Sequence, residues 1–271
     1  MCQLFAVTAS EQIQINTELS TFIEGSHIHK HGWGSAVIDD SGHVHIKRET
    51  IPAYESAYLR HLLERPVMTK NAMYHIRYAT VGSIDANNTH PITELDMTGR
   101  QWTMIHNGTM FNCDILNDYF HTQTGSTDTE RMLLYIVDEM NKQHMHSHEP
   151  LDFEERFDLI SQLLARLSNR NKVNVILSDS EYIYVHGNSI GGSKALGEIA
   201  SKDYIYELAE SGKQIFATIP LSEDSRWQPV PINTVRAYKD GELIKTAKPH
   251  DNEYIESEED LRYLYSGFSD L

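Results

Sequence analysis

The chain has 271 residues, 40% of them hydrophobic and 23% charged, which is ordinary for a globular protein with a sizeable core. It carries 23 Lys and Arg against 39 Asp and Glu, so its formal net charge is −16, and such an acidic surface argues against nucleic acid and anionic membranes as partners. No apolar run approaches the roughly 18 residues of a membrane span, and no basic, signal-like segment opens the sequence. Two cysteines do not make a disulfide-stapled extracellular scaffold, so we expect a cytoplasmic protein with reduced thiols.

The first hundred residues predict mainly strands. Segment 2–8 is short, apolar and rich in strand formers. Segments 32–39 and 43–48 flank a glycine-containing turn and predict a hairpin. Further strands are expected at 72–79 and at 101–106, with a helical stretch at 53–65.

The pattern becomes helical after residue 126. Thr127 and Glu130 have the spacing of a capping box, and an apolar helical pattern follows them. A second amphipathic helix is predicted over 151–168. The remaining strands are expected at 174–179, 181–187, 214–220 and 235–245.

The order of these elements predicts the fold class. Many strands, two consecutive helices and then more strands do not give the regular alternation of a parallel doubly wound sheet. We therefore expect an α+β protein in which helices cover antiparallel sheets. No repeat or linker divides the chain, so we expect one domain over 1–250, with an acidic tail over 251–271 packed on it as a loose helix or trailing from it.

Cys2 follows the initiator methionine directly, and this position has a chemical meaning. If Met1 is removed, one residue carries both a thiol and a free α-amine. The thiol, with a pKa near ~8.5, is only slightly ionised at neutral pH, whereas the α-amine, with a pKa near ~7.7–8.0, is partly neutral and can accept its proton. Cys2 is then a nucleophile with its own general base, whereas the other cysteine, Cys113, has no such amine.

Three further positions supply what such a nucleophile needs. The Asn107 side-chain amide and the Gly108 N–H can form an oxyanion hole, although an Asn-Gly pair is also an ordinary turn. Arg77 lies in an apolar strand and can hold a carboxylate, or form a structural ion pair. Asp128 opens a helix, where a carboxylate also serves simply as a dipole partner.

Six stretches, in order and at compatible spacing, resemble the class II glutamine amidotransferases, which are N-terminal-nucleophile hydrolases. They are MCQLFAV at 1–7, HGWGSAVI at 31–38, HIRYATVG at 75–82, NTHPI at 88–92, IHNGTM at 105–110 and STDTE at 126–130. A later block, ATIPLSEDSRWQPVP at 217–231, resembles the small stand-alone members, so the likeness spans nearly the whole chain. The resemblance implies a four-layer αββα sandwich of two antiparallel sheets flanked by helices, and hydrolysis of the glutamine γ-amide through a thioester.

The resemblance also implies roles for individual residues. Cys2 is the expected nucleophile, and Asn107 and Gly108 the expected oxyanion donors. The expected substrate-binding residues are Arg77 and Thr80 for the α-carboxylate, Asp128 for the α-ammonium, and Gly32 in a loop that approaches the nucleophile. His75 and His106 flank these positions and are expected to pack behind them. We expect no cofactor and no metal.

Two departures from the family pattern matter. Val81 stands where the sugar-synthase branch has a histidine, which affects the details of carboxylate binding but not the Arg77 contact. The chain also ends before any synthase domain, so an acceptor for the ammonia is expected on a separate partner protein, or is absent.

Three alternatives remain open from the sequence. Binding of the γ-glutamyl end by Arg77 and Asp128 would serve equally for other γ-glutamyl amides or peptides as substrates. The alternating histidines His27, His29 and His31, and the group His144, His146 and His148, suggest a metal-binding module if each group lies on one face of a strand, although a solvated histidine-rich loop is the preferred interpretation. A non-catalytic, partner-binding member of the same fold is the third.

Overall fold

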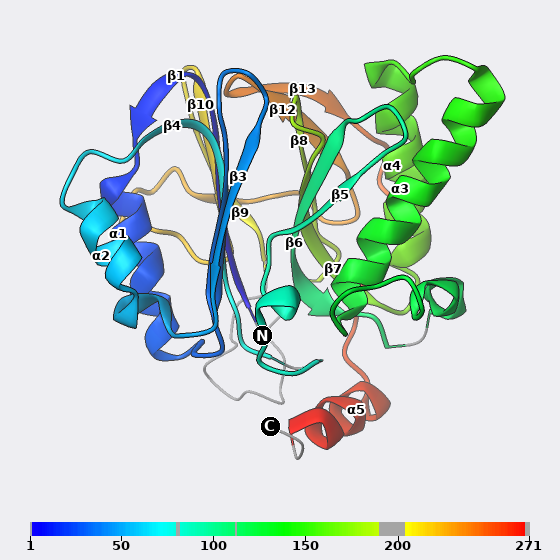
Figure 1. Ribbon diagram of the computed structural model, residues 1–271, viewed down its shortest axis with the longest axis horizontal. Helices are drawn as coiled ribbons and strands as arrows, with labels where there is room; N and C mark the ends of the chain where they lie inside the picture. Colours follow the sequence, from blue (N-terminus) through cyan, green and yellow to red (C-terminus); the bar gives the residue numbers. More distant parts are fainter. Residues whose placement is uncertain (1, 80–81, 112, 190–203, 269–271) are drawn as a thin grey trace.

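Two antiparallel sheets lie face to face, and helices cover the outer face of each (Figure 1). The computed structural model describes residues 2–79, 82–111, 113–189 and 204–268, the last four of these as backbone only. The result is the four-layer α+β sandwich that the sequence predicts. No helix in this described part of the chain has the length and apolar character needed to cross a bilayer.

The first sheet has seven strands, with the N-terminal strand at its centre. Their order is β11 (Gln228–Pro229), β9 (Tyr206–Glu210), β10 (Lys213–Ala217), β1 (Gln3–Gln14), β4 (Met68–Ile76), β2 (Trp33–Ile38) and β3 (Val44–Glu49). Because side chains alternate along a strand, Phe5 and Val7 face the helices while Leu4 and Ala6 face the second sheet. The next residue on the inner side, towards the N-terminus, is Cys2.

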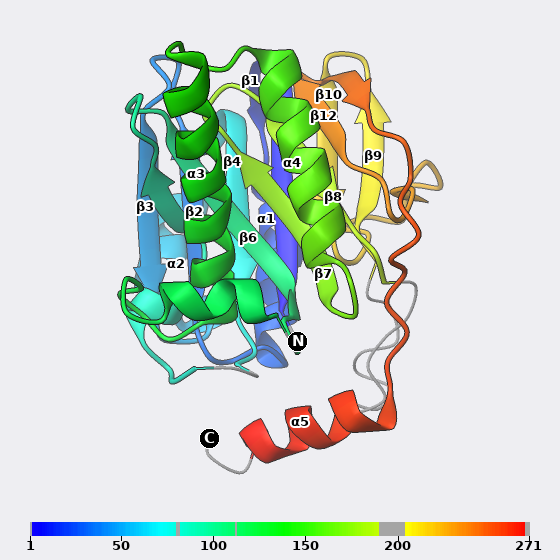
Figure 2. The same ribbon diagram turned by 90° about the vertical axis from the view of Figure 1, so that its right-hand side faces the viewer.

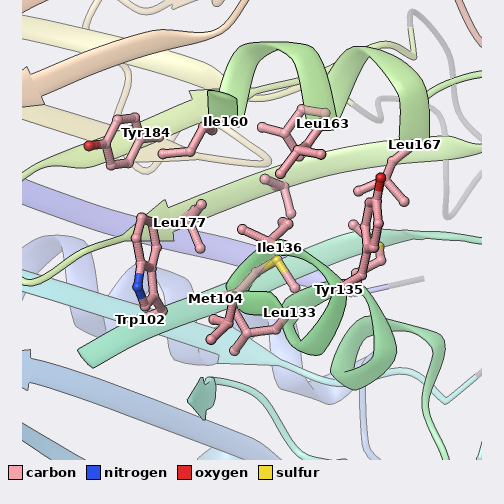
Figure 3. Close-up of a cluster of buried hydrophobic side chains, with 14 of the residues drawn as sticks. Trp102, Met104, Leu133, Tyr135, Ile136, Ile160, Leu163, Leu167, Leu177 and Tyr184 are labelled. Carbon is pink, nitrogen blue, oxygen red and sulfur yellow. The ribbon is translucent and has the colours of Figure 1, made fainter. Parts of the chain in front are cut away.

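The second sheet has six strands. Their order is β13 (Glu242–Thr246), β12 (Arg236–Lys239), β8 (Ile183–His186), β7 (Lys172–Ser178), β6 (Gln101–Thr109) and β5 (Ile92–Leu95). Its outer face packs against α3 (Asp128–Ser147) and α4 (Phe153–Leu167), and Figure 3 shows Trp102 and Leu177 of the sheet facing Ile136 and Ile160 of the two helices. The inner face carries Ile105 on β6, so Asn107, two residues on, also faces the first sheet.

The helix beginnings follow the expected capping chemistry only in part. The Thr127 side chain accepts the Glu130 N–H at 3.3 Å, which starts α3. The Glu130 carboxylate, however, accepts the N–H groups of Thr124 and Gly125 in the preceding loop, so it fixes that loop instead of completing the box. The box is complete at α4, between Asp152 and Glu155.

Several elements differ from the sequence prediction. Helix α1 (Asn16–Glu24) and strands β5 and β9 were not predicted, and the stretch 53–65 is a short 3₁₀ turn followed by α2 (Ala57–Leu63). Helix α1 follows a twelve-residue strand, and its cap residue Ile15 provides no side-chain hydrogen bond, so no start signal marks it. Burial of Leu19, Phe22 and Ile23 against the first sheet stabilises this helix instead.

The C-terminal strap, residues 247–257, leads from the second sheet to helix α5 (Glu258–Phe268), which lies near the N-terminus and apart from the four layers (Figure 2). Asn188 donates to the Asn252 carbonyl at 3.0 Å, and Asn252 donates to the Ala165 carbonyl at 2.8 Å. The Tyr254 N–H donates to the Asn188 carbonyl at 2.7 Å. These partly buried polar contacts fix the path of the strap and therefore the point from which α5 starts.

Candidate active site

The pairing of β1, β4 and β2 brings Cys2, Arg77 and Gly32 together. Gln3 lies opposite Ile76 in the register of β1 and β4, so the preceding Cys2 lies beside Arg77. The Arg77 N–H donates to the Gly32 carbonyl at 2.8 Å. The Cys2 Sγ lies 3.7 Å from the Tyr78 carbonyl. Residues that are far apart in sequence thus meet at one end of the first sheet.

The Cys2 thiol is protonated in its surroundings. Burial raises the pKa of the thiol, and the positive charge of Arg77 opposes that rise only in part. A thiol of this kind is a poor nucleophile until a base removes its proton. Attack by this sulfur therefore requires a proton acceptor close to it.

Asn107 reaches Cys2 from the opposite sheet. Its Oδ1 accepts the Cys2 N–H at 3.3 Å, which fixes the orientation of the side-chain amide. The side chain is 1% exposed, and its Nδ2 has no hydrogen-bond partner in the described part of the chain. A buried donor without an acceptor is costly, by about 1–3 kcal/mol, so this nitrogen is a natural place for an oxygen of a ligand.

Gly108, the next residue, offers a second N–H, on the edge of β6 that faces away from β7. Val173 lies opposite Gly108, and its N–H and C=O bond Asn188 and His186 on the far side of β7. This pair is therefore a non-hydrogen-bonded pair of the ladder, and the Gly108 N–H points away from β7. On that side β5 ends its pairing at Met104, so no strand covers Gly108.

A side chain at position 108 has no room. A Cβ there would lie 1.9 Å from the Lys172 carbonyl oxygen and 2.3 Å from the Nε2 of His106. The His106 ring crosses this space because its Nε2 donates to the Lys172 carbonyl at 3.1 Å. Glycine at 108 is therefore what allows His106 to tie β6 to β7 beside the site.

Arg77 is 3% exposed, and its guanidinium bonds backbone carbonyls of the segment that follows it. It donates to the carbonyls of Ser83 at 2.8 Å and Gly82 at 3.1 Å. Burial lowers the pKa of the guanidinium, while the Asp128 carboxylate opposes this, as a group of opposite charge close to it does. The arginine remains charged at any physiological pH.

Asp128 lies at the first position of α3 and is 5% exposed. Its Oδ2 accepts the Met110 N–H at 2.8 Å and its Oδ1 accepts the Thr129 N–H at 2.9 Å. The first contact ties the carboxylate to the segment that follows Gly108. These two N–H bonds hold the Asp128 side chain in a fixed, buried position at the start of the helix.

The other two expected substrate-binding residues have different outcomes. Gly32 has a φ of 128°, and a Cβ there would lie 2.9 Å from the Glu49 carbonyl, so the backbone beside Arg77 requires glycine. Thr80, like Val81, lies outside the described residues.

Three buried histidines lie behind these residues. The rings of His75 and His90 have centroids 4.3 Å apart, and burial lowers the pKa of both well below the usual value, so both stay neutral. The His106 Nδ1 accepts the Thr129 hydroxyl at 2.9 Å, since its Nε2 donates to Lys172. Sequence reasoning expected His75 and His106 to pack here but gave His90 no place; its position in NTHPI was the only signal.

The two histidine groups that suggested a metal are not arranged on strands. His27 ends a 3₁₀ turn and stacks on Tyr54, and His29 is buried, so the first group is not a solvated loop. The second group lies at the C-terminal end of α3, where His144 is also buried. Neither group therefore lies on one face of a strand, which was the condition for the metal-binding alternative. Among the residues that the structure describes, no three His, Cys, Asp or Glu side chains are grouped to hold a metal ion.

Comparison with known proteins supplies the family. Residues 1–261 match the family described as "Glutamine amidotransferases class-II". The chain belongs to the class II glutamine amidotransferases. It is 24% identical over 258 residues to the Escherichia coli protein named "Putative glutamine amidotransferase YafJ", covering 90% of this chain and 100% of YafJ. A Haemophilus influenzae protein with a similar name is 25% identical over 258 residues, covering 90% and 86% of the two chains.

Solved structures of other amidotransferases share the fold. A glutamine aminotransferase class-II domain protein from Silicibacter pomeroyi superposes with a TM-score of 0.58 at 17% identity, over 92% of this chain and all of that one. The Bacillus subtilis glutamine phosphoribosylpyrophosphate amidotransferase superposes with a TM-score of 0.62 at 16% identity over 91% of this chain. This chain spans about half (49%) of the length of the Bacillus enzyme. At these identities the likeness concerns the fold, the N-terminal-nucleophile type of amidotransferase sandwich.

Proposed function

We propose that this class II glutamine amidotransferase hydrolyses the γ-amide of glutamine through a thioester on Cys2, releasing glutamate and ammonia. The observation that carries the proposal is the meeting of Cys2 with Asn107, whose amide nitrogen is buried and without a partner in the described chain. A nucleophile and an unused donor for the carbonyl oxygen that it attacks are the two parts that acyl transfer needs first.

The proton acceptor in this mechanism is the α-amine that Cys2 gains when Met1 is removed. The amine takes the thiol proton, the sulfur bonds to the carbonyl carbon of the γ-amide, and the carbonyl oxygen becomes an oxyanion held by Asn107 Nδ2 and Gly108 N–H. The proton is then passed to the leaving nitrogen as the C–N bond breaks, and ammonia departs. Water, deprotonated by the same amine, cleaves the thioester to give glutamate and the free thiol.

The charged groups fit the other end of glutamine. Arg77 offers a cation for the α-carboxylate, and Asp128 an anion for the α-ammonium, on either side of the place where the chain of the substrate would run. Thr80 is proposed to assist at the carboxylate and Gly32 to leave space beside it. An ammonia acceptor on a separate protein stays a prediction.

The decisive test compares the two cysteines. We expect Cys2→Ala to lower glutamate release from glutamine by at least about 10³-fold, the scale of losing a nucleophile, and Cys113→Ser to leave it unchanged. Intact mass of the active protein should show loss of Met1. Retention of Met1 in fully active protein, or equal activity of the Cys2→Ala variant, would rule out the mechanism.

A substrate screen then defines the leaving group. Glutamine and a panel of γ-glutamyl amides and dipeptides share the γ-glutamyl end that Arg77 and Asp128 would hold. We expect the highest kcat/KM for glutamine. A γ-glutamyl dipeptide turned over faster than glutamine would instead assign the protein to hydrolysis of such peptides.

A further inference from the structure

An aromatic cluster connects helix α5 to the segment that carries the Asp128 contact. Met110, whose N–H binds the Asp128 carboxylate, is followed by Phe111. The Phe111 ring stacks on Tyr254 of the C-terminal strap at a centroid distance of 5.6 Å. Phe111 also contacts the Tyr263 ring of α5, in an edge-to-face arrangement with a centroid distance of 5.7 Å. Phe111 therefore lies between the strap and α5, one residue from a direct contact of Asp128.

Tyr263 is also electrostatically close to Asp128. Burial raises the pKa of the Tyr263 hydroxyl, and the negative charge of Asp128 raises it further. The ring is 43% exposed, so one side faces the protein and the other faces solvent. Tyr263 is therefore placed to shield the Asp128 side of the site from solvent.

The position of α5 is set by contacts independent of the site. The partly buried hydrogen bonds of Asn188 and Asn252 hold the strap, and the Tyr254 hydroxyl donates to Asp260 in the first turn of α5 at 3.2 Å. Figure 2 shows α5 across the end of the sandwich at which the N-terminus lies. The helix is thus held across the mouth of the site while leaving a cavity of about 400 Å³ between α5, the strap and Phe111.

We propose that Tyr263 is a specificity-determining residue that closes the α-ammonium side of the substrate site, so that the site takes γ-glutamyl compounds with a free α-amino group and rejects glutamine acylated on that nitrogen. The proposal rests on the proposed function, because it takes Asp128 as the partner of the ammonium. An acyl group on the α-nitrogen removes the positive charge that Asp128 would bind and extends towards Phe111 and Tyr263.

The charge of the surroundings agrees with this selection. Six acidic residues lie in the strap and the first turn of α5, namely Asp251, Glu253, Glu256, Glu258, Glu259 and Asp260. Such a negative region attracts a cationic group and disfavours a second carboxylate on this side of the site.

The test measures a ratio of specificities. Ammonia release from glutamine and from Nα-acetyl-glutamine, whose α-nitrogen is an uncharged amide, gives kcat/KM for each substrate. We expect the wild-type protein to prefer glutamine strongly and Tyr263→Ala to reduce that preference about tenfold or more, mainly by increasing turnover of Nα-acetyl-glutamine. Tyr263→Phe retains the ring and should retain the preference, as should Ile255→Ala, which removes an exposed strap side chain outside the aromatic cluster.

The outcomes are separable. A folded Tyr263→Ala variant with an unchanged ratio overturns the proposal, because a merely structural role would lower both kcat/KM values together. If wild-type protein does not hydrolyse glutamine, the proposed function fails. The affinities of Cys2→Ala protein for the two compounds, with and without Tyr263→Ala, then decide the present proposal by calorimetry: a Kd ratio unchanged by the substitution overturns it.

Discussion

Two buried polar clusters in this protein differ in how completely their atoms are bonded. Asp179, which is fully buried, accepts from Arg156 at 2.9 Å, from Tyr184 at 3.0 Å and from two backbone N–H groups. Arg156 in turn donates to the Leu151 carbonyl at 2.8 Å. In the active-site cluster, by contrast, Asn107 uses its oxygen and leaves its nitrogen without a partner among the described residues.

This difference distinguishes a polar cluster that stabilises the fold from one that can bind a ligand. A saturated network ties α4 to the second sheet and has no bonding capacity left for a ligand. A cluster with an unused buried donor is less stable by itself and is completed when a carbonyl oxygen arrives. Burial alone does not distinguish the two, since both clusters are almost inaccessible to solvent.

The largest expected effect breaks the saturated network. Arg156→Met should lower the free energy of unfolding by about 3 kcal/mol, because it leaves the buried Asp179 carboxylate with only the longer, 3.5 Å ion pair to Arg100. Urea unfolding at 25 °C measures this, with Arg60→Met on the exposed face of α2 as a control. Protein that remains folded should keep the kcat for glutamine, and a tenfold fall in kcat would show that the two clusters are coupled.

The next effect breaks the active-site cluster. Asn107→Ala should lower kcat by about 10²–10³-fold, the scale of removing one oxyanion donor, and its Nδ2 contributes nothing to the stability that is lost, because the only hydrogen bond removed from the described residues is the one that Oδ1 accepts from the Cys2 N–H. Asn174, directly opposite on β7, accepts the Asn188 N–H and provides the matched control. We expect Asn174→Ala to cost stability and to spare kcat; the reverse pattern would exchange their roles.

A smaller effect concerns Arg77. In Arg77→Lys a point charge replaces a planar fork, so KM for glutamine should rise about tenfold or more while kcat changes less. Initial rates over a range of glutamine concentrations separate the two parameters. An unchanged KM would remove Arg77 from the substrate site and leave it as an anchor for the carbonyls of Ser83 and Gly82.

The smallest expected effect is on stability against pH, away from the site. Burial lowers the pKa of His186 to about 3, against about 6.5 when unfolded. The unfolded chain therefore binds an extra proton between these values, so the contribution to stability is full above about pH 6.5 and falls by about 1.4 kcal/mol per pH unit as the pH drops. His186→Gln should flatten the stability curve between pH 6.5 and 5. An unaltered slope would mean that other buried histidines dominate it.

Alternation and turn residues, which are local signals, predicted most of the strands, whereas the four layers were implied by the resemblance to the family. The sequence also named residues that meet at one end of the sandwich, since Cys2, Arg77, Asn107 and Asp128 stand in recognisable stretches. Helix α1 was missed because its stabilisation comes from packing and not from a cap.

Other relations depend on three-dimensional contacts that no spacing encodes. One such relation is that the His106 ring occupies the space that a side chain at position 108 would need. The contact of Tyr263 with Phe111 is another, because the acidic tail predicted only a loose helix or a trailing end, whereas the strap fixes its course.

The central place of β1 has a consequence for biosynthesis. Phe5 pairs with Ala217, and the Leu4 N–H donates to the Thr218 hydroxyl at 2.8 Å, so β1 pairs with a strand that is synthesised about two hundred residues later. Until β10 has been synthesised, one edge of β1 stays exposed. The removal of Met1 that the proposed mechanism requires would therefore have this period to act before β10 pairs with β1.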